Sequence, residues 1–401
     1  MISLEEARAR ILAPLRPTAA EVVGLAEAWR RVTAAPVRAR LTQPPRDVSA
    51  MDGYALDASD GLPGSSLAVV GSAPAGHPWE GTLRHGEALS IFTGSVMPAG
   101  ADAVLLVEDA VREGERVTVK EAVTQGRWIR RSGQDFTCND VLVSSCKRLN
   151  SRDIGLLAAG NHPWLLVHRR PRVAILATGD EIALPGEPIP PGGIVSSNSH
   201  ALAAIVRACG GEPVVLPVAP DDRAALGAAA AAARGMDMLV TTGGASVGEH
   251  DLVQSALGDH GLEVDFWTVA MRPGKPVIHG RLGNVPMVGL PGNPVSSLVC
   301  GIVFLVPAIE RLSGLPGEAP PLEQAVLGAP LAANDARADH LRATLALRDD
   351  GTLVVTAFPR QDSAMLRVLA GADALILRPP NALALLAGAM VPIIRLDRLG
   401  L

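Results

Sequence analysis

The chain has 401 residues, of which 48% are hydrophobic and only 3% aromatic, and its formal net charge at pH 7 is −5. This length exceeds what one hydrophobic core usually holds and predicts about two to four domains. Because the chain is mildly acidic and poor in aromatic side chains, we do not expect it to bind nucleic acid. An anionic ligand would need a local basic site, oriented N–H groups or a metal ion.

The N-terminal segment begins with "SLEEARARIL", in which Ser3 and Glu6 have the spacing of a helix capping box. Residues 1–30 are therefore expected to be largely helical. From about residue 43 to about residue 135, short β-rich runs alternate with proline and glycine, which predicts a β-rich unit. Residues 137–168 return to mixed structure, with a short helix predicted at Ile154–Ala159.

From Pro171 onward, apolar runs typical of buried strands alternate with helical patterns. This alternation predicts an α/β domain with a mostly parallel sheet. Ligands of such sheets bind at the carboxyl ends of the strands. After about residue 320 the pattern becomes β-rich again, and "RDDGT" predicts a hairpin turn at Asp350-Gly351. The sequence thus predicts a multidomain α/β protein with a β-rich domain on either side of the α/β domain.

The uncharged segment Val285–Ile309 has the composition of a membrane span. The "LPGNP" stretch at Leu290–Pro294 is expected to break a helix, and the part that remains after it looks too short to cross a bilayer. We therefore predict a buried core helix and no membrane association. The cysteines form no CxxC pair and no secretory signal is recognised, so we expect reduced thiols in a cytoplasmic protein, with a disulfide between the first two as the weaker alternative. They are Cys138, Cys146, Cys209 and Cys300.

Three polar loops follow predicted strands. In "TTGGASVGEHD" the amides of Gly243, Gly244 and Gly248 could cradle a phosphate and Ser246 could add a hydroxyl, although a helix-starting turn would have the same composition. "ATGDE" places Asp180 and Glu181 at a second strand end, where a capped helix start is the alternative. The third loop, "LPGNPVSS", is made rigid by its prolines.

Cations and further carboxylates lie outside these loops. Arg272 and Lys275 flank a Pro-Gly turn in "RPGKP", which suits a small oxyanion unless it is only a solvated surface turn. Asp52 in "SAMDGYA" and Asp135 in "RRSGQD" lie in the predicted β-rich unit. Carboxylates that converge can hold Mg²⁺, and Mg²⁺ can bind a phosphorylated ligand.

Taken together, these motifs resemble the MoeA family of molybdopterin molybdenumtransferases, to which the E domain of gephyrin is related. The resemblance rests on "SAMDGYA", "FTGSVMPAGADAVLLVED", "RPRVAILATGDE", "GGASVGEHD", "RPGKP", "GLPGNPVSS" and "RQDSAMLRVLAGADALILRP", in this order and over nearly the whole chain. It implies an elongated subunit of four parts, which ends in a β-barrel-like domain. The parts are residues 1–43 with 137–168, 44–136, 169–320 and 321–401.

The resemblance also implies a reaction, in which adenylyl-molybdopterin is cleaved in a metal-dependent step with molybdate and yields the molybdenum cofactor and AMP. It implies a homodimer whose cleft lies between the α/β domain of one subunit and the inserted domain of the other. Molybdopterin adenylyltransferase and molybdoenzymes are the protein partners that it suggests.

Roles for single residues follow from the resemblance. The catalytic candidates are Asp52, Asp135, Glu181, Asp221 (or Asp222 beside it) and Asp251, and those for Mg²⁺ are Glu181 and Asp251. The substrate-binding candidates are Thr178, Gly179, Gly243, Gly244, Ser246, Gly248, Arg272, Lys275, Pro291, Gly292, Asn293, Arg337 and Ser363.

Two positions depart from the family pattern. Arg272 stands where lysine is frequent, which keeps the charge but changes its geometry. Asp362 stands where glycine is usual, and its negative charge would weaken oxyanion binding at Ser363. Two alternative functions are a molybdopterin adenylyltransferase, which typically consists of the α/β domain alone, and a non-enzymatic dimeric scaffold, which would need no carboxylates in its loops.

Overall fold

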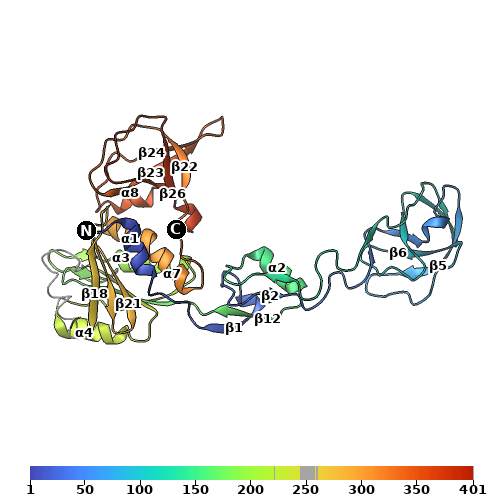
Figure 1. Ribbon diagram of the computed structural model, residues 1–401, viewed down its shortest axis with the longest axis horizontal. Coiled ribbons are helices and arrows are strands. Elements are labelled where there is room, and N and C mark those ends of the chain that lie inside the picture. Colours follow the sequence, from blue (N-terminus) through green and yellow to red (C-terminus); the bar gives the residue numbers. More distant parts are fainter. Residues whose placement is uncertain (221, 244–257, 259–260, 401) are drawn as a thin grey trace.

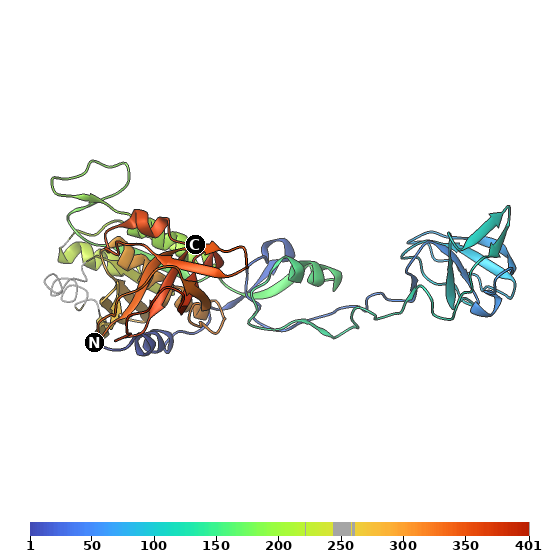
Figure 2. The same cartoon turned by 90° about the horizontal axis from the view of Figure 1, so that it is seen from above.

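The computed structural model describes residues 1–220, 222–243, 258 and 261–400. The chain is elongated, and the α/β sheet and the C-terminal β domain lie together at one end, where both termini also lie (Figure 1). A β-rich unit forms the other end, and a narrow connecting region joins the two (Figures 1 and 2). The multidomain α/β architecture predicted from the sequence is confirmed, whereas the exact domain boundaries stay predictions.

The β-rich unit at the far end contains a six-stranded sheet in the order β7-β4-β6-β5-β9-β8. Its core is formed by residues such as Leu56, Leu89 and Leu105, which are almost fully buried. This confirms the β-rich reading of the segment. The elements are β4 (Gly53–Leu56), η2 (Ala58–Asp60), β5 (Ser66–Ala73), β6 (Glu87–Ile91), β7 (Ala103–Leu106), β8 (Ala110–Glu113) and β9 (Arg116–Val119).

Short antiparallel pairs in the connecting region join the chain running out to the β-rich unit with the chain running back. The pairs are β1 (Ala20–Gly24) with β12 (Trp164–His168), β2 (Val37–Arg38) with β11 (Val141–Val143), and β3 (Val48–Ser49) with β10 (Ile129–Arg130). Helix α2 (Ser151–Ala159) begins at a capping box, because the Asn150 side chain accepts from the Asp153 N–H and the Asp153 carboxylate accepts from the Asn150 N–H.

The N-terminal segment is less helical than expected. Helix α1 (Leu4–Leu12) is capped by Ser3 as predicted, with the Glu6 N–H donating to the Ser3 hydroxyl at 3.1 Å. Pro14 ends the helical pattern, since it lacks an N–H and restricts the residue before it, and the chain then enters β1 and the short turn η1 (Leu25–Glu27). The expectation of helix up to residue 30 was therefore wrong.

The resemblance groups residues 1–43 with residues 137–168, but helix α1 packs elsewhere. Its buried residues Leu4, Ala7 and Ile11 belong to the core of the α/β domain. They do so because the helix packs against the helices that cover that sheet.

The α/β domain contains a six-stranded mixed sheet in the order β16-β13-β17-β21-β20-β18. The first four strands are parallel, and β20 and β18 are antiparallel to their neighbours. The strands are β13 (Arg172–Ala177), β16 (Glu212–Val215), β17 (Met238–Thr242), β18 (Leu262–Thr268), β20 (Pro276–Leu282) and β21 (Val285–Leu290). The helices are α3 (Asn198–Ala208), α4 (Arg223–Ala232), α6 (Pro294–Cys300) and α7 (Val306–Leu312), with the π-helical turn η3 (Gly301–Leu305) between the last two.

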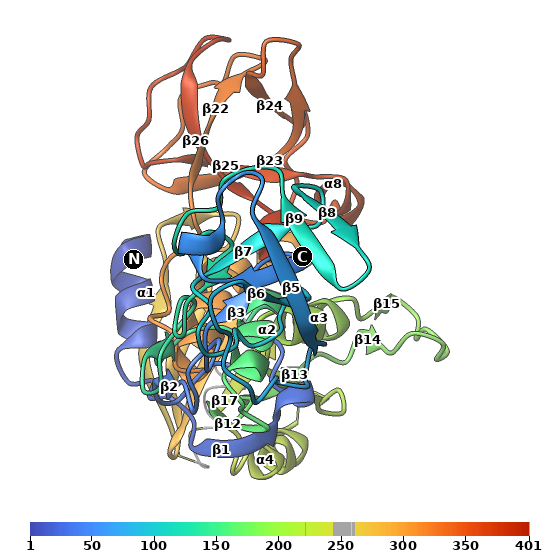
Figure 3. The ribbon, with the colours of Figure 1, turned by 90° about the vertical axis from the view of Figure 1, so that its right-hand side faces the viewer.

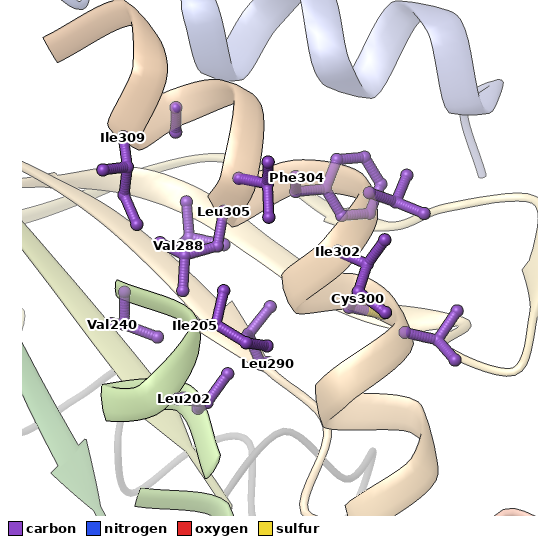
Figure 4. Packing of buried hydrophobic residues seen from close by; sticks show 14 of the residues in the cluster. Leu202, Ile205, Val240, Val288, Leu290, Cys300, Ile302, Phe304, Leu305 and Ile309 are labelled. Atoms are coloured by element: carbon purple, nitrogen blue, oxygen red, sulfur yellow. The ribbon is translucent and has the colours of Figure 1, made fainter. Parts of the chain in front are cut away.

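Residues of β13 alternate between two cores, as the twofold period of a strand requires. Val173 and Ile175 pack with α3, α6, η3 and α7, while Ala174 and Leu176 pack with residues of α4. Figure 4 shows the first core, in which Leu202 and Ile205 of α3 lie close to Val240 on its strand. Burial on both faces explains why these strands read as continuous apolar runs.

The apolar segment that mimics a membrane span forms one continuous helix, Pro294–Leu312. Pro294 occupies the first turn, where its missing N–H costs nothing, so the helix is longer than the sequence argument assumed. Its 19 residues have a mean hydropathy of 1.8, but 83% of its most apolar window is buried in the protein. Among the described residues it is the one helix with the length and composition of a span. Its burial identifies it as the predicted core helix.

The C-terminal domain forms a barrel, because β23-β24-β22-β26-β25 closes through a pairing of β25 with β23. The predicted hairpin is present, and Gly351 supplies the positive φ of its turn. The elements are β22 (Glu323–Leu327), β23 (Ala338–Leu347), β24 (Leu353–Ala357), α8 (Leu366–Ala370), β25 (Ala374–Arg378), β26 (Met390–Arg395) and η4 (Asp397–Leu399). The barrel meets the α/β domain where β19 (Met271–Arg272) pairs with β23. The end-on view in Figure 3 shows the barrel beside the α/β domain.

Candidate active site at the strand ends

Three parallel strands of the α/β domain end at the same level of the sheet. Ala177 of β13 is paired with Thr242 of β17, and Thr242 is paired with Leu290 of β21. The loops that follow these strands therefore start side by side. They border a pocket of about 570 Å³, at the sheet edge where the sequence predicted a ligand site.

The pocket contains both predicted residues and residues that the sequence analysis missed. The predicted residues that line it are Thr178, Glu181, Gly243, Pro291, Gly292 and Asn293. The missed ones are Ala177, Ile182, Ile194, Val195, Ser196, Ser197, Asn198, Thr242, Pro276, Pro294 and Ala364. A usable signal was the polar run Ser196-Ser197-Asn198 at the start of α3 (Asn198–Ala208), which the sequence analysis did not single out. Its place at the pocket depends on where the chain returns to the sheet.

Glycines let two of the loops approach each other. Gly243 has φ +95°, and a Cβ there would lie 2.4 Å from the carbonyl oxygen of Thr178. A Cβ on Gly292 would lie 3.5 Å from the Cα of Gly243. A side chain at either position would occupy this contact, so the glycines leave room for a ligand close to the backbone.

The pocket is rich in hydrogen-bond donors. Helix α3 and the helix Pro294–Leu312 both begin at its wall, and neither Ser197 nor Asn293 makes a side-chain cap. The first N–H groups of a helix have no partner inside the helix and attract anions. The buried Thr178 hydroxyl also has no hydrogen-bond partner within the described part of the chain. Such a pocket suits an anionic group such as a phosphate.

Of the predicted carboxylates that the structure describes, only one lines the pocket. Glu181 is exposed and lines it, directly after β13. Asp222, the alternative to Asp221, caps α4, because its Oδ1 accepts from the N–H groups of Ala224 and Ala225 at 2.7 and 3.1 Å. Its carboxylate therefore has a structural role.

Several predicted site residues lie outside the described residues, namely Asp221, Gly244, Ser246, Gly248 and Asp251. Of the two metal candidates, only Glu181 is therefore placed. The described ranges bring no three His, Cys, Asp or Glu side chains close enough to hold a metal ion. Oxygen donors such as Glu181 suit Mg²⁺, but this carboxylate alone is only part of a metal site.

Asp52 and Asp135 do not reach the pocket of their own chain. Asp52 directly precedes β4 of the β-rich unit, and Asp135 lies between β10 and β11, where the chain leads back from that unit. The β-rich unit is far from the α/β domain (Figure 1). The carboxylate of Asp52 accepts the N–H and the hydroxyl of Thr93 at 2.7 and 2.8 Å, and these hydrogen bonds lower its pKa. Asp52 is therefore held in its ionised form.

The predicted oxyanion cations lie near the seam between the α/β domain and the barrel. Arg272 forms a two-pronged ion pair with Asp339 at 2.8 Å for each bond, and hydrogen bonding to Asp339 raises the pKa of Arg272. Arg337 pairs with Asp335 at 2.6 Å. The charge of each arginine is thus balanced by an aspartate of the same chain.

Other predicted residues at this seam are sequence neighbours of Pro276 and Ala364, which line the pocket. Lys275 is exposed and precedes Pro276, which lines the pocket. The carbonyl of Ser363 accepts the Val295 N–H at 3.0 Å in the first turn of the apolar helix. The carboxylate of Asp362, the residue that departs from the family pattern, accepts the Ala364 N–H at 2.7 Å. Among the described residues, the C-terminal domain therefore contributes Ala364 to the pocket lining.

The cysteine prediction is confirmed for all four positions. Cys138 and Cys146 are exposed and free, and Cys209 and Cys300 are buried and free. Burial raises the pKa of Cys209 to about 12, so this thiol stays protonated.

Three sequence profiles match the chain in consecutive segments. Residues 2–160 match the MoeA N-terminal region (domain I and II), and residues 174–311 match a probable molybdopterin binding domain. Residues 324–396 match the MoeA C-terminal region (domain IV). The pocket lies mainly within the second segment.

Curated proteins and solved structures agree with these matches. The chain is 36% identical to molybdopterin molybdenumtransferase 2 of Mycobacterium tuberculosis, over 98% of this chain and 99% of that protein. It is 39% identical to a molybdopterin molybdenumtransferase of Nostoc over 74% of this chain and 70% of that protein. The crystal structure of a molybdopterin biosynthesis MoeA protein from Pyrococcus superposes with a TM-score of 0.84 at 29% identity, covering 98% of this chain and 99% of that one.

Proposed function

Because this chain belongs to the MoeA family, we propose that it inserts molybdenum into molybdopterin. The reaction would cleave adenylyl-molybdopterin in the presence of molybdate and release AMP. The observation that carries the proposal is the pocket at the strand ends. It lies in the segment that matches a molybdopterin binding domain, and it presents donors suited to a phosphate.

The donors of the pocket would bind the phosphate part of the substrate. The backbone at Gly243 and Gly292 is accessible because neither residue has a side chain, and the start of α3 adds oriented N–H groups. The other helix start adds fewer, since Pro294 has no N–H and the Val295 N–H donates to Ser363. The Thr178 hydroxyl would supply a further donor. Fixed donors of this kind stabilise negative charge that develops on a phosphate without having to reorient.

Molybdate would bind next to this pocket, at the seam with the barrel. Lys275 offers an exposed charge beside the pocket wall. Arg272 is held in a fixed orientation by Asp339, which also balances its charge, so it would bind the oxyanion only with the N–H groups that the aspartates leave free. Arg337 and Ser363 of the C-terminal domain would complete this subsite. A pre-oriented guanidinium can bind an oxyanion with little loss of side-chain entropy.

Glu181 and Asp251 would hold Mg²⁺, with Asp221 nearby. A bound Mg²⁺ would neutralise phosphate charge during cleavage. Glu181 is suited to this role because it lies directly after β13, at the pocket wall, where a cation that it holds would meet the phosphate.

A second subunit would supply Asp52 and Asp135, so we propose a homodimer with a shared site. The elongated shape allows it, because the β-rich unit projects far from the pocket of its own chain (Figure 1). We further propose that the protein works in the cytoplasm, receives its substrate from a molybdopterin adenylyltransferase and delivers its product to molybdoenzymes.

The alternative functions are less favoured. An adenylyltransferase would need only the α/β domain, whereas this chain also matches the MoeA N-terminal and C-terminal regions. A scaffold would need no pocket rich in donors with a carboxylate at its wall.

The direct test is AMP release from adenylyl-molybdopterin, with molybdate and Mg²⁺ each present or omitted. We expect release that depends on both, with molybdenum recovered in the pterin. Glu181→Gln should lower kcat/KM by at least about tenfold. Glu187→Gln is the matched control, since its carboxylate accepts the Leu184 N–H away from the pocket. Absence of release from the folded wild-type protein would refute the proposal.

A further inference from the structure

Asn198 joins two of the strand-end loops. It is the first residue of α3, it is 8% exposed, and it lies in the pocket wall. Its side-chain amide donates to the carbonyl oxygen of Gly292 and to the hydroxyl of Thr242, both at 2.8 Å. Because a carbonyl oxygen can only accept, the orientation of this amide is determined. Both of its hydrogens are therefore used, on two different loops.

Thr242 contacts the carbonyl of Pro291, the residue that precedes Gly292 in the same loop. Its hydroxyl lies 3.3 Å from the carbonyl oxygen of Pro291 and 3.3 Å from the hydroxyl of Ser297. Since the Thr242 oxygen accepts from Asn198, its own proton is free to go to the Pro291 carbonyl. Asn198 and Thr242 thus hold two consecutive carbonyls of one loop.

Holding these carbonyls also fixes the N–H groups of the same peptide units. In a planar trans peptide the C=O and the N–H point in opposite directions. The N–H groups of Gly292 and Asn293 therefore point away from the side chains that hold the carbonyls. Neither N–H has a hydrogen-bond partner in the described ranges of the chain. Both belong to residues that line the pocket.

We propose that Asn198 is a positioning residue for the phosphate subsite and acts together with Thr242. The pair would hold the loop 291–293 so that its free N–H groups face the phosphate of the substrate. Asn198 would not contact the reacting atoms, since both of its amide hydrogens are used inside the protein. This inference rests on the proposed function and adds to it a network that determines the shape of the subsite.

The test compares Asn198→Ala, Thr242→Val and the double variant in AMP release from adenylyl-molybdopterin. Each single change removes hydrogen bonds to the loop and should raise KM about tenfold, with a smaller effect on kcat. Because the two side chains form one network, the double variant should be little worse than either single variant. Thr242→Ser keeps the hydroxyl and should stay within about twofold of the wild type.

Asn150→Ala is the matched control. It removes an asparagine side chain that also makes two hydrogen bonds to the backbone, at the start of α2 in the connecting region. It should lower Tm and leave KM unchanged. Asn198→Leu removes both donors without adding a charge and keeps most of the volume of the side chain, and it replaces Asn198→Ala if that variant does not fold.

Five outcomes decide the inference. Raised KM with a non-additive double variant supports it. Wild-type KM in the Asn198 and Thr242 variants, with only Tm lowered as in Asn150→Ala, overturns it while the proposed function stands. If the effects of the two single variants on KM add fully in the double variant, Asn198 and Thr242 do not act as one network. If the wild type does not turn over, AMP binding is measured by calorimetry instead. Weaker AMP binding by Asn198→Ala than by the wild type would then still support the inference. A wild type that neither turns over nor binds AMP overturns both proposals.

Discussion

Thr178 has a buried hydroxyl without a hydrogen-bond partner among the residues that the structure describes. The residue is 2% exposed and lies in the wall of the candidate pocket. A buried polar group that is left unpaired costs free energy, and such groups in native proteins call for an explanation. Ligand binding provides one here, because the hydroxyl could then donate to a phosphate oxygen.

The valine variant separates the two effects of this hydroxyl. Thr178→Val keeps the shape and removes the unpaired group, so the free energy of unfolding should stay the same or rise by about 1 kcal/mol. Substrate affinity should fall by about 1 kcal/mol, or roughly fivefold in KM. Thermal unfolding and AMP-release kinetics measure the two quantities. A variant that is less stable but has an unchanged KM would contradict the assignment.

His340 is a second buried polar residue, placed in β23 (Ala338–Leu347) next to Asp339. It is 1% exposed, and neither of its ring nitrogens has a hydrogen-bond partner in the described structure. Burial lowers its pKa from near 6.5 to about 4, opposed by the charges of Asp339 and Glu5 and assisted by that of Arg8. The imidazole is therefore neutral in the folded protein at pH 7.

This pKa has a consequence for stability in acid. Between about pH 6.5 and pH 4 the unfolded chain binds a proton at His340 that the folded chain does not, so stability is lost as the pH falls through this range. The loss from this residue is about 3 kcal/mol in full. Between pH 7 and pH 4.5 the Tm of His340→Phe should therefore fall by less than the Tm of the wild type. Parallel Tm curves for the two proteins would contradict this prediction.

At the scale of the element, the helix Pro294–Leu312 shows why burial decides what an apolar segment becomes. Phe304, in its π-helical turn, is fully buried in the core that also contains α1 (Leu4–Leu12) and one face of the sheet. Figure 4 shows Phe304 in this core, near Leu305 and Ile302. A helix of this composition is stable in water because the α/β sheet and its neighbouring helices cover it.

Truncating this side chain tests the role of the helix in the core. Phe304→Ala should reduce the free energy of unfolding by about 3–5 kcal/mol, through lost burial and the cavity that remains. Leu347→Ala, at a position that is 73% exposed, should change it by less than about 0.5 kcal/mol. Urea unfolding of the three proteins gives the comparison. Equal losses in the two variants would contradict the buried role of the helix.

At the scale of the whole molecule, the distance between the β-rich unit and the pocket separates the predicted carboxylates. Asp52 directly precedes β4 (Gly53–Leu56) of the β-rich unit, and Glu181 follows β13 (Arg172–Ala177) of the α/β sheet. These two parts lie at opposite ends of the elongated chain (Figure 1). In a twofold dimer each site would combine Glu181 of one subunit with Asp52 of the other. Two inactive variants could then complement each other.

Complementation is expected between Asp52→Asn and Glu181→Gln. In a heterodimer of the two, one site carries both changes and the other carries neither, so about half of the wild-type activity should return. Differently tagged, co-expressed subunits purified on both tags give this heterodimer for AMP-release assays. Asp57→Asn, which affects a turn in the β-rich unit, should be active alone. An inactive heterodimer would contradict a site shared between subunits.

The sequence by itself determined much of the fold and part of the site. Apolar runs alternating with helical patterns indicated the mostly parallel arrangement of β16, β13, β17 and β21, and Asp-Gly indicated the C-terminal hairpin. It also proposed Thr178, Glu181, Gly243 and the loop 291–293 as site residues, and these line one pocket, while their roles stay predictions. The fold predictions succeeded because they depend on local composition and on one rule, that parallel strands end at the same edge of a sheet.

Only the tertiary structure decided the contacts made between distant segments. Asn198 lies 44 residues from Thr242 and 94 from Gly292, and Arg272 lies 67 from its partner Asp339. Each of these hydrogen bonds depends on how the chain returns to the sheet or how the barrel docks on it. Side-chain hydrogen bonds require partners within about 3 Å, and sequence spacing does not specify such distances between separate elements. For the same reason, Asp222 proved to be a helix cap, and the helix Pro294–Leu312 was identified as a core helix by its burial.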